Sequence, residues 1–183
     1  MNSRTTVVVD YGVGNVLSVC RAVEHCGGPV RLTSEANLIA TADQVILPGV
    51  GAFGDCANTL ASHGLIEPLK SFMATGRPFL GICVGMQLLF DYSEEFGHHP
   101  GLGEIRGHVR RLQPVLEDGL EAKVPFIGWA ELTPGKAFAV RDSWLRAIDN
   151  ETAVYFVNSY TAQPSDPDQI AAQCQQFGPA MQP

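Results

Sequence analysis

The sequence predicts an α/β fold, a doubly wound and mostly parallel β-sheet flanked by helices, with a β-rich second half. Strand-length apolar runs alternate with helical patterns over the first ninety residues, which is typical of a parallel sheet. Glycine-bearing loops follow three of these runs, after Asp10, Leu47 and Ile82. Each loop leaves the carboxyl end of a predicted strand, where ligands gather in such sheets. Beyond Tyr92 helical patterns become few.

Composition indicates a folded chain that forms one domain over residues 1–183. The net charge of -7 argues against nucleic acid or an anionic membrane as the main partner. No run approaches the ~20 apolar residues of a membrane span, and the first residues do not resemble a signal peptide. The five cysteines form no Cys-x-x-Cys pair, so we expect no metal site, no disulfide framework and a cytoplasmic location.

The first half is expected to open with a buried strand over Thr5–Asp10, because this run is β-branched and continuous. A helix over Val16–Cys26 follows and ends at two glycines. The further elements expected here are a strand at Pro29–Thr33, a helix from a Ser34 cap to about Ala42, a strand at Gln44–Leu47, helices at Asp55–Ser62 and Leu65–Thr75, and a strand ending at Cys83.

The second half is expected to be built from strands joined by turns. Ser93–Gly103 is polar and glycine-rich and predicts a surface loop. The predicted strands are Ile105–Leu112, Lys123–Leu132, Ala153–Tyr160 and Ile170–Cys174.

Cys83 lies in Gly81-Ile82-Cys83-Val84-Gly85, at the point where an apolar strand gives way to a helical pattern that continues through Phe90. This is the context of a nucleophile elbow, in which the reactive residue occupies a strained turn with close neighbours. The start of a helix also favours negative charge. The alternative is a buried structural cysteine at a strand end. The flanking glycines favour a nucleophile.

The segment Gly49–Gly54 matches Gly-x-Gly-x-x-Gly, the fingerprint of dinucleotide sites. That fingerprint usually follows the first strand and needs an acidic strand end ~20 residues later. Here this distance falls within Ile66–Phe72, which has a helical pattern. We therefore prefer an oxyanion hole, in which backbone N–H groups of the loop stabilise a developing negative charge near Cys83. A tight turn without chemical function is the alternative.

The residues alone leave the catalytic set incomplete. A cysteine nucleophile in acyl transfer needs a base, usually His, and a carboxylate that orients it. No histidine follows His108.

Nearly the whole chain resembles the class I (triad-type) glutamine amidotransferases, a family with a flavodoxin-like sheet, and within it the glutaminase subunits of imidazole glycerol phosphate synthase. The resemblance is carried by Asp10–Asn15, Leu47–Gly54, Gly81–Phe90, Gly107–Arg110, Lys123–Trp129 and Tyr155–Tyr160.

The resemblance implies roles for residues in most of these motifs. Cys83 would attack the side-chain amide of glutamine. The N–H groups of Val84 and, after the Pro48–Gly51 loop rearranges, of Val50 would hold the oxyanion. The loop glycines are Gly49 and Gly51; the residues implied for substrate binding are Gln87, Ser159 and Tyr160, and those implied for the partner interface are Asn15, Ile127 and Trp129.

The resemblance also implies that glutamine is hydrolysed to glutamate and ammonia without a cofactor. The ammonia would pass, within a heterodimer, to a (β/α)₈-barrel cyclase subunit that makes imidazole glycerol phosphate and aminoimidazole carboxamide ribotide for histidine biosynthesis. Three alternatives stay open: a non-catalytic or truncated homologue that only docks a cyclase, a paralogue that supplies ammonia to surface-sugar biosynthesis, and another cysteine enzyme with a different base.

The family's catalytic His and Glu lie in a Gln-Phe-His-Pro-Glu-Lys motif on a late strand. Gln176–Ala180 echoes this motif, but Gly178 and Ala180 stand where His and Glu are expected. The segment Ile170–Gly178 aligns more naturally with the strand before the motif. We therefore expect the sequence to lack the family's last strand and helix, together with the base and its orienting residue.

Overall fold

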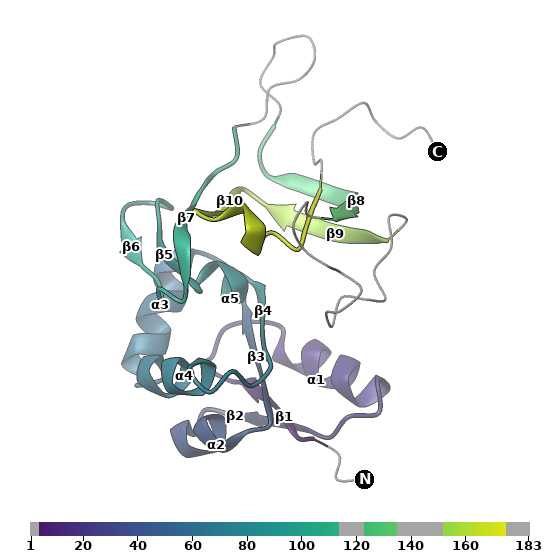
Figure 1. Cartoon of the computed structure of the whole chain (residues 1–183), viewed down its shortest axis with the longest axis vertical. Helices are drawn as coiled ribbons and strands as arrows, with labels where there is room; N and C mark the ends of the chain where they lie inside the picture. The colour runs from purple at the N-terminus through teal and green to yellow at the C-terminus, as the bar shows by residue number, and fades with distance from the viewer. Residues whose placement is uncertain (1–3, 114–122, 135–151, 175–183) are drawn as a thin grey trace. The chain divides into compact units, whose positions relative to one another are not determined.

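The computed structural model describes residues 4–113, 123–134 and 152–174 (Figure 1). The chain divides into two compact units, Met1–His108 and Val109–Pro183, and each is described here by itself. The expectation of one domain over residues 1–183 stays a prediction.

The first unit contains a four-stranded sheet with the order β2-β1-β3-β4. Its strands are β1 (Thr6–Val9), β2 (Val30–Thr33), β3 (Gln44–Gly49) and β4 (Phe79–Cys83), and all neighbouring pairs are parallel. This order matches the first four strands of a flavodoxin-like sheet, so the predicted fold class is confirmed. The strand order reverses between β1 and β3, and the carboxyl ends of these two strands form the switch point at which such sheets bind ligands.

Helices cover both faces of this sheet (Figure 1). Helix α1 (Val16–His25) lies on one face, and α2 (Ala36–Thr41) and α4 (Ile66–Met73) lie on the other. Right-handed crossovers require this arrangement, because the chain changes direction across the sheet after β2. Helix α3 (Phe53–Ser62) precedes α4. The buried core includes all of β1 and the side chains of Ile39, Leu47, Leu60, Leu69 and Phe72.

Several predicted boundaries in this unit were wrong by one or two residues, and three of them have a clear physical reason. Helix α2 begins at Ala36 after Glu35, so Ser34 is not its cap; instead the Glu35 N–H donates to the Thr33 hydroxyl at 3.0 Å. Strand β3 extends to Gly49 because its pairing with β4, which starts at Val45, continues to Gly49. Helix α3 begins at Phe53, whose N–H donates to the Glu95 carboxylate at 2.6 Å.

The helical pattern expected through Phe90 was also wrong, because α5 covers only Val84–Gln87. The carbonyls of Leu88 and Leu89 accept from the N–H groups of Leu102 and Ile105, at 2.7 and 2.9 Å, so they cannot continue a helix. Strand β5 (Phe90–Ser93) follows and pairs with the short β6 (His99–Pro100), within the segment predicted as a surface loop.

The second unit is rich in strands, as predicted. Strand β7 (Ile105–Arg111) runs into it from the first unit. Strands β8 (Phe126–Pro134) and β9 (Ala153–Asn158) are antiparallel, and β11 (Ala172–Cys174) pairs with the other edge of β8. Tyr160 belongs to a separate strand, β10 (Tyr160–Pro164), which a 3₁₀ turn at Pro167–Gln169 follows. Residues 176–180, which echo the family's late motif, lie outside the described residues.

None of the helices within residues 4–113, 123–134 and 152–174 has the length and apolar character needed to cross a membrane.

The close contact between β3 and α5 predicts a strong penalty for Gly85→Ala. A Cβ at this position would overlap the carbonyl oxygen of Leu47 and lie 2.8 Å from its carbon. Because both partners are backbone, we expect a loss of about 3 kcal/mol in the free energy of unfolding, measured by urea denaturation.

The control is Gly76→Ala. Gly76 has a φ of 70°, and no atom lies within 4 Å of the position of its Cβ. At this position the alanine side chain meets no other atom, so the only cost is the left-handed backbone conformation, about 1 kcal/mol in the free energy of unfolding. If the two variants lost the same free energy of unfolding, the close approach of β3 to Gly85 would not be the reason for the penalty.

Candidate active site

Cys83 links β4 to α5 in a strained backbone conformation. Its φ is 55° and its ψ is -119°, in the positive-φ region that side chains other than glycine rarely adopt. Holding a residue there costs about 1–3 kcal/mol, and such strain clusters at functional sites. The residue is exposed, so its sulfur is accessible. The predicted strand–turn–helix arrangement is therefore present.

Two glycines let the backbone fold tightly around Cys83. A Cβ at Gly81 would lie 2.5 Å from the Cα of Met86, so the strand before Cys83 touches the helix after it. A Cβ at Gly85 would overlap the backbone of β3. Both positions of the Gly-x-Cys-x-Gly pattern are thus required by close packing.

The loop Pro48–Gly51 lies directly beside Cys83, as the sequence predicted for an oxyanion loop. Gly49 is paired in register with Cys83. A Cβ at Gly49 would lie 2.5 Å from the nitrogen of Gly85 and 3.0 Å from the Cβ of Val84. Gly51 then turns the chain away with a φ of 94°. Gly49 and Gly51 therefore supply the close approach and the turn.

The strand pairing shows which way the loop's peptide groups face. N–H and C=O groups of successive strand residues point alternately to the two neighbouring strands. The Val45 N–H donates to Pro78 at 3.0 Å, so the odd-numbered residues of β3 face β4 and the even-numbered ones face β1. The Gly49 carbonyl thus faces the Cys83 side, and the N–H of Val50 faces the opposite side. For Val50 to serve an oxyanion at Cys83, this peptide must rotate.

Two buried side chains donate hydrogen bonds to backbone carbonyls of the Pro48–Gly51 loop. The hydroxyl of Tyr11, two residues after β1, donates to the carbonyl of Pro48 at 2.9 Å. The Cys56 thiol, on α3, donates to the carbonyl of Val50 at 3.4 Å. Burial, with the nearby Cys56, raises the pKa of Tyr11, and burial also raises the pKa of Cys56. Both groups therefore keep their protons near neutral pH and can donate.

Neither Tyr11, which lies within the Asp10–Asn15 motif, nor Cys56 was predicted to be a site residue. Tyr11 follows a strand and Cys56 lies within a helical pattern, and both features are common in ordinary core residues. Their shared role comes from contacts between segments far apart in the chain, which no local pattern signals.

The other predicted site residues are divided between the two units. In the first unit, Gln87 ends α5 one turn after Cys83 and is 8% exposed, whereas Asn15 is exposed and caps α1 by accepting from the Ser18 N–H. In the second unit, Ser159 separates β9 from β10, and its carbonyl accepts from Leu112; Tyr160 begins β10. Ile127 and Trp129 are 61% and 65% exposed on β8.

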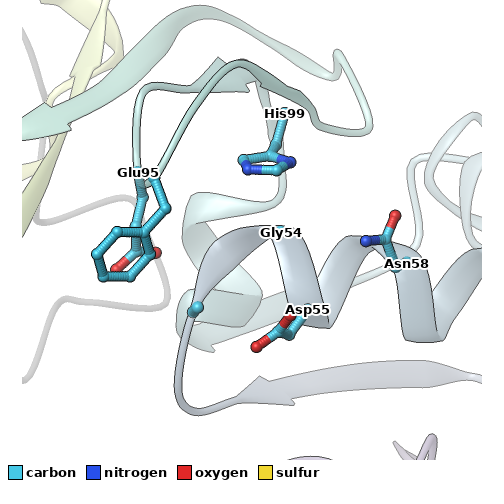
Figure 2. Close-up of a pocket in the computed structure, with 7 residues that line it drawn as sticks. Gly54, Asp55, Asn58, Glu95 and His99 are labelled. Carbon is cyan, nitrogen blue, oxygen red and sulfur yellow. The ribbon is translucent and has the colours of Figure 1, made fainter.

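A hollow of about 280 Å³ lies between the start of α3 and the segment around Glu95 (Figure 2). Figure 2 shows Asp55 and Asn58 on the helix and Glu95 and His99 on the opposite segment. The Glu95 carboxylate accepts from Phe53 at the first turn of α3, where a negative charge is favourable. With two carboxylates on its wall, the hollow suits a small cationic group.

The histidines engage groups other than Cys83. His98 and His108 stack on Tyr92, with ring centroids 4.6 and 5.3 Å away, and the ring of His99 lies against Gly54. Across residues 4–113, which contain all five histidines, no hydrogen bond joins one of them to Cys83. The described residues also contain no group of three or more His, Cys, Asp or Glu side chains placed to hold a metal ion.

Comparison with known proteins identifies the family. The family model for glutamine amidotransferase class-I matches residues 7–180. The chain is 43% identical to imidazole glycerol phosphate synthase subunit HisH of Syntrophotalea carbinolica over 167 residues, which cover 91% of this chain and 79% of the relative. It is 44% identical to HisH 1 of Legionella pneumophila strain Lens over 164 residues, covering 87% and 76%.

A solved structure supports the same fold. The crystal structure of a glutamine amidotransferase matches with a TM-score of 0.66 at 14% identity, over 91% of this chain and 79% of that one. The fold, the elbow at Cys83 and the matched sequences agree: the chain belongs to the class I glutamine amidotransferase family, among the relatives of the HisH subunit.

Proposed function

We propose that the chain is the glutaminase subunit of an imidazole glycerol phosphate synthase. It hydrolyses glutamine to glutamate and ammonia, and the ammonia is delivered to a partner cyclase that makes imidazole glycerol phosphate and aminoimidazole carboxamide ribotide. The observation that carries this proposal is the position of Cys83, strained, exposed and in register with Gly49 of the loop. The identity to HisH subunits supports the choice of substrate and pathway.

The proposed reaction proceeds through a thioester at Cys83. The sulfur attacks the side-chain amide carbon of glutamine, and the carbonyl oxygen becomes an oxyanion held by the N–H groups of Val50 and Val84. The C–N bond then breaks, and the nitrogen leaves with an added proton as ammonia. Water attacks the thioester, the C–S bond breaks, and glutamate is released. Each oxyanion donor contributes about 10²–10³-fold in rate in comparable enzymes.

The amino-acid end of glutamine is assigned to Gln87, Ser159 and Tyr160 by family resemblance. The carboxylates of Asp55 and Glu95 in the hollow beside the loop add a site for its α-ammonium group. A buried amide and a carboxylate are the groups that such an amino acid needs for orientation.

The cyclase is proposed to bind as the second subunit of a heterodimer, through a surface that includes Asn15, Ile127 and Trp129. On the sheet of the second unit, Ile127 and Trp129 lie opposite the exposed side chains of Val157 and Tyr155. Exposed apolar side chains grouped in this way are typical of protein interfaces. The pathway fits a cytoplasmic protein, and the proposed reaction needs no cofactor.

The base is the one part of the proposed reaction to which no described residue is assigned. The test therefore uses a reagent that alkylates the nucleophile directly: a chloroketone analogue of glutamine, which the Cys83 sulfur attacks at the CH₂Cl carbon, forming a C–S bond and expelling chloride. Selective reaction tests both the nucleophile and recognition of glutamine.

We expect one equivalent of the chloroketone to react at Cys83, measured by intact mass and peptide mapping. Glutamine should protect the residue, and Cys83→Ala should remove the adduct. Cys26 is a matched exposed thiol within the same protein. Labelling of Cys26 and Cys83 at equal rates, without protection by glutamine, would contradict the proposed function and favour a homologue that only docks a cyclase.

A second prediction concerns the charge of Glu95. Glu95→Gln keeps an oxygen that can accept from the Phe53 N–H but removes the negative charge from the hollow. We expect the chloroketone's KI to rise about tenfold, as for the loss of a charge-assisted hydrogen bond. The rate constant for an N-acetylated chloroketone, which has no ammonium group, serves as the control and should not change. If Glu95→Gln slowed the labelling of Cys83 by both reagents to the same extent, Glu95 would act only on the structure of the loop.

A further inference from the structure

We propose that Tyr11 and Cys56 are positioning residues that confine the rotation of the oxyanion loop to a single peptide group, the one between Gly49 and Val50. This inference rests on the proposed function, since it concerns the loop that would serve Cys83. It assigns a catalytic purpose to two buried side chains that contact neither the substrate nor the reacting atoms.

The two hydrogen bonds flank the peptide that has to turn. Tyr11 holds the carbonyl of Pro48, which belongs to the peptide before Gly49. Cys56 holds the carbonyl of Val50, which belongs to the peptide after Val50. Between them, the N–H of Val50 donates to no protein acceptor among the described residues. The central peptide is therefore free to rotate while its neighbours are held.

The backbone at this point permits such a rotation. Turning one peptide plane changes mainly the ψ of the residue before it and the φ of the residue after it. The first of these residues is Gly49, which has no Cβ to obstruct a new ψ. Gly51, with its φ of 94°, already provides the turn that follows. Only one N–H and one C=O exchange sides, and the rest of the loop stays packed against Val84 and Gly85.

The anchors are themselves rigid. Tyr11 and Cys56 are both 0% exposed; Tyr11 lies two residues after the buried strand β1, and Cys56 lies within α3. Burial raises the pKa of each, so both stay protonated donors. Loss of either bond would let a neighbouring peptide turn as well, and the Val50 N–H would no longer be aimed at one point.

The test compares two reagents at Cys83 in the full chain. The chloroketone analogue of glutamine carries a carbonyl oxygen that the oxyanion donors polarise. Iodoethane alkylates the same sulfur, with loss of iodide, and has no carbonyl oxygen for these donors to polarise. The ratio of their rate constants, measured by peptide mass at Cys83, isolates the contribution of the loop from general changes in thiol exposure or folding.

Tyr11→Phe and Cys56→Ala should each lower this ratio of rate constants about tenfold. Deleting an oxyanion donor costs about 10²–10³-fold. The expected effect is smaller because each variant displaces the Val50 N–H without removing it. The fall should appear in kinact, with KI unchanged. Cys56→Ser keeps a donor and should restore the ratio to within about threefold. Cys26→Ser, a change at an exposed site, is the control.

The outcomes separate this inference from the proposed function. If the wild-type protein shows no selective labelling at Cys83, the proposed function fails. If the wild type is selectively labelled but the ratio stays unchanged or rises in Tyr11→Phe and Cys56→Ala, only the anchoring role is wrong. If one variant does not fold, the other decides, because the two anchors act on different peptides. A fall in Cys56→Ala that Cys56→Ser does not restore would also overturn the role of the Cys56 hydrogen bond.

Discussion

The close approach of the ends of β3 and β4 is the constraint on which the site depends. Gly49 and Gly85 bring the loop and the elbow to a separation that no side chain could share. Strands β3 and β4 are parallel and paired in register, so Gly49 lies beside Cys83. This pairing fixes which residues of the loop and the elbow meet. The site is therefore built mainly from backbone atoms. Its geometry depends on the lack of a side chain at Gly49 and Gly85 more than on which side chains surround them.

This constraint accounts for the strain at Cys83 and for the layers around it. The chain leaves β4 close to β3 and enters α5 through a positive φ at Cys83, and the surrounding packing stabilises that conformation. Helix α5 then ends after four residues, because the Leu88 and Leu89 carbonyls bind the segment that returns after β6. Behind the loop, Tyr11 and Cys56 connect the switch point of the sheet to α3. Between the strained Cys83 and the hydrogen bonds from Tyr11 and Cys56, only the peptide between Gly49 and Val50 is able to rotate.

Much of this arrangement follows from local sequence. The parallel α/β sheet, the elbow at Cys83 and the adjacent glycine loop could be predicted, because apolar periodicity and paired glycines are local signals. The end of α5, the strands β5 and β6, and the first turn of α3 could not. Helix α3 begins early because of Glu95, 42 residues further along the chain. The meeting of Tyr11 and Cys56 likewise depends on tertiary packing, and nothing in either residue's neighbourhood signals it. The roles assigned to Ser159, Tyr160 and Trp129 come from family resemblance and stay predictions.

The most direct test of this account is a crystal structure of the protein after Cys83 has reacted with the chloroketone analogue of glutamine. We predict that the adduct's oxygen lies about 3 Å from the nitrogens of both Val50 and Val84, with the Gly49–Val50 peptide rotated and the bonds from Tyr11 and Cys56 kept. An adduct oxygen that contacts neither nitrogen, beside a loop whose Gly49 carbonyl still faces Cys83, would contradict it.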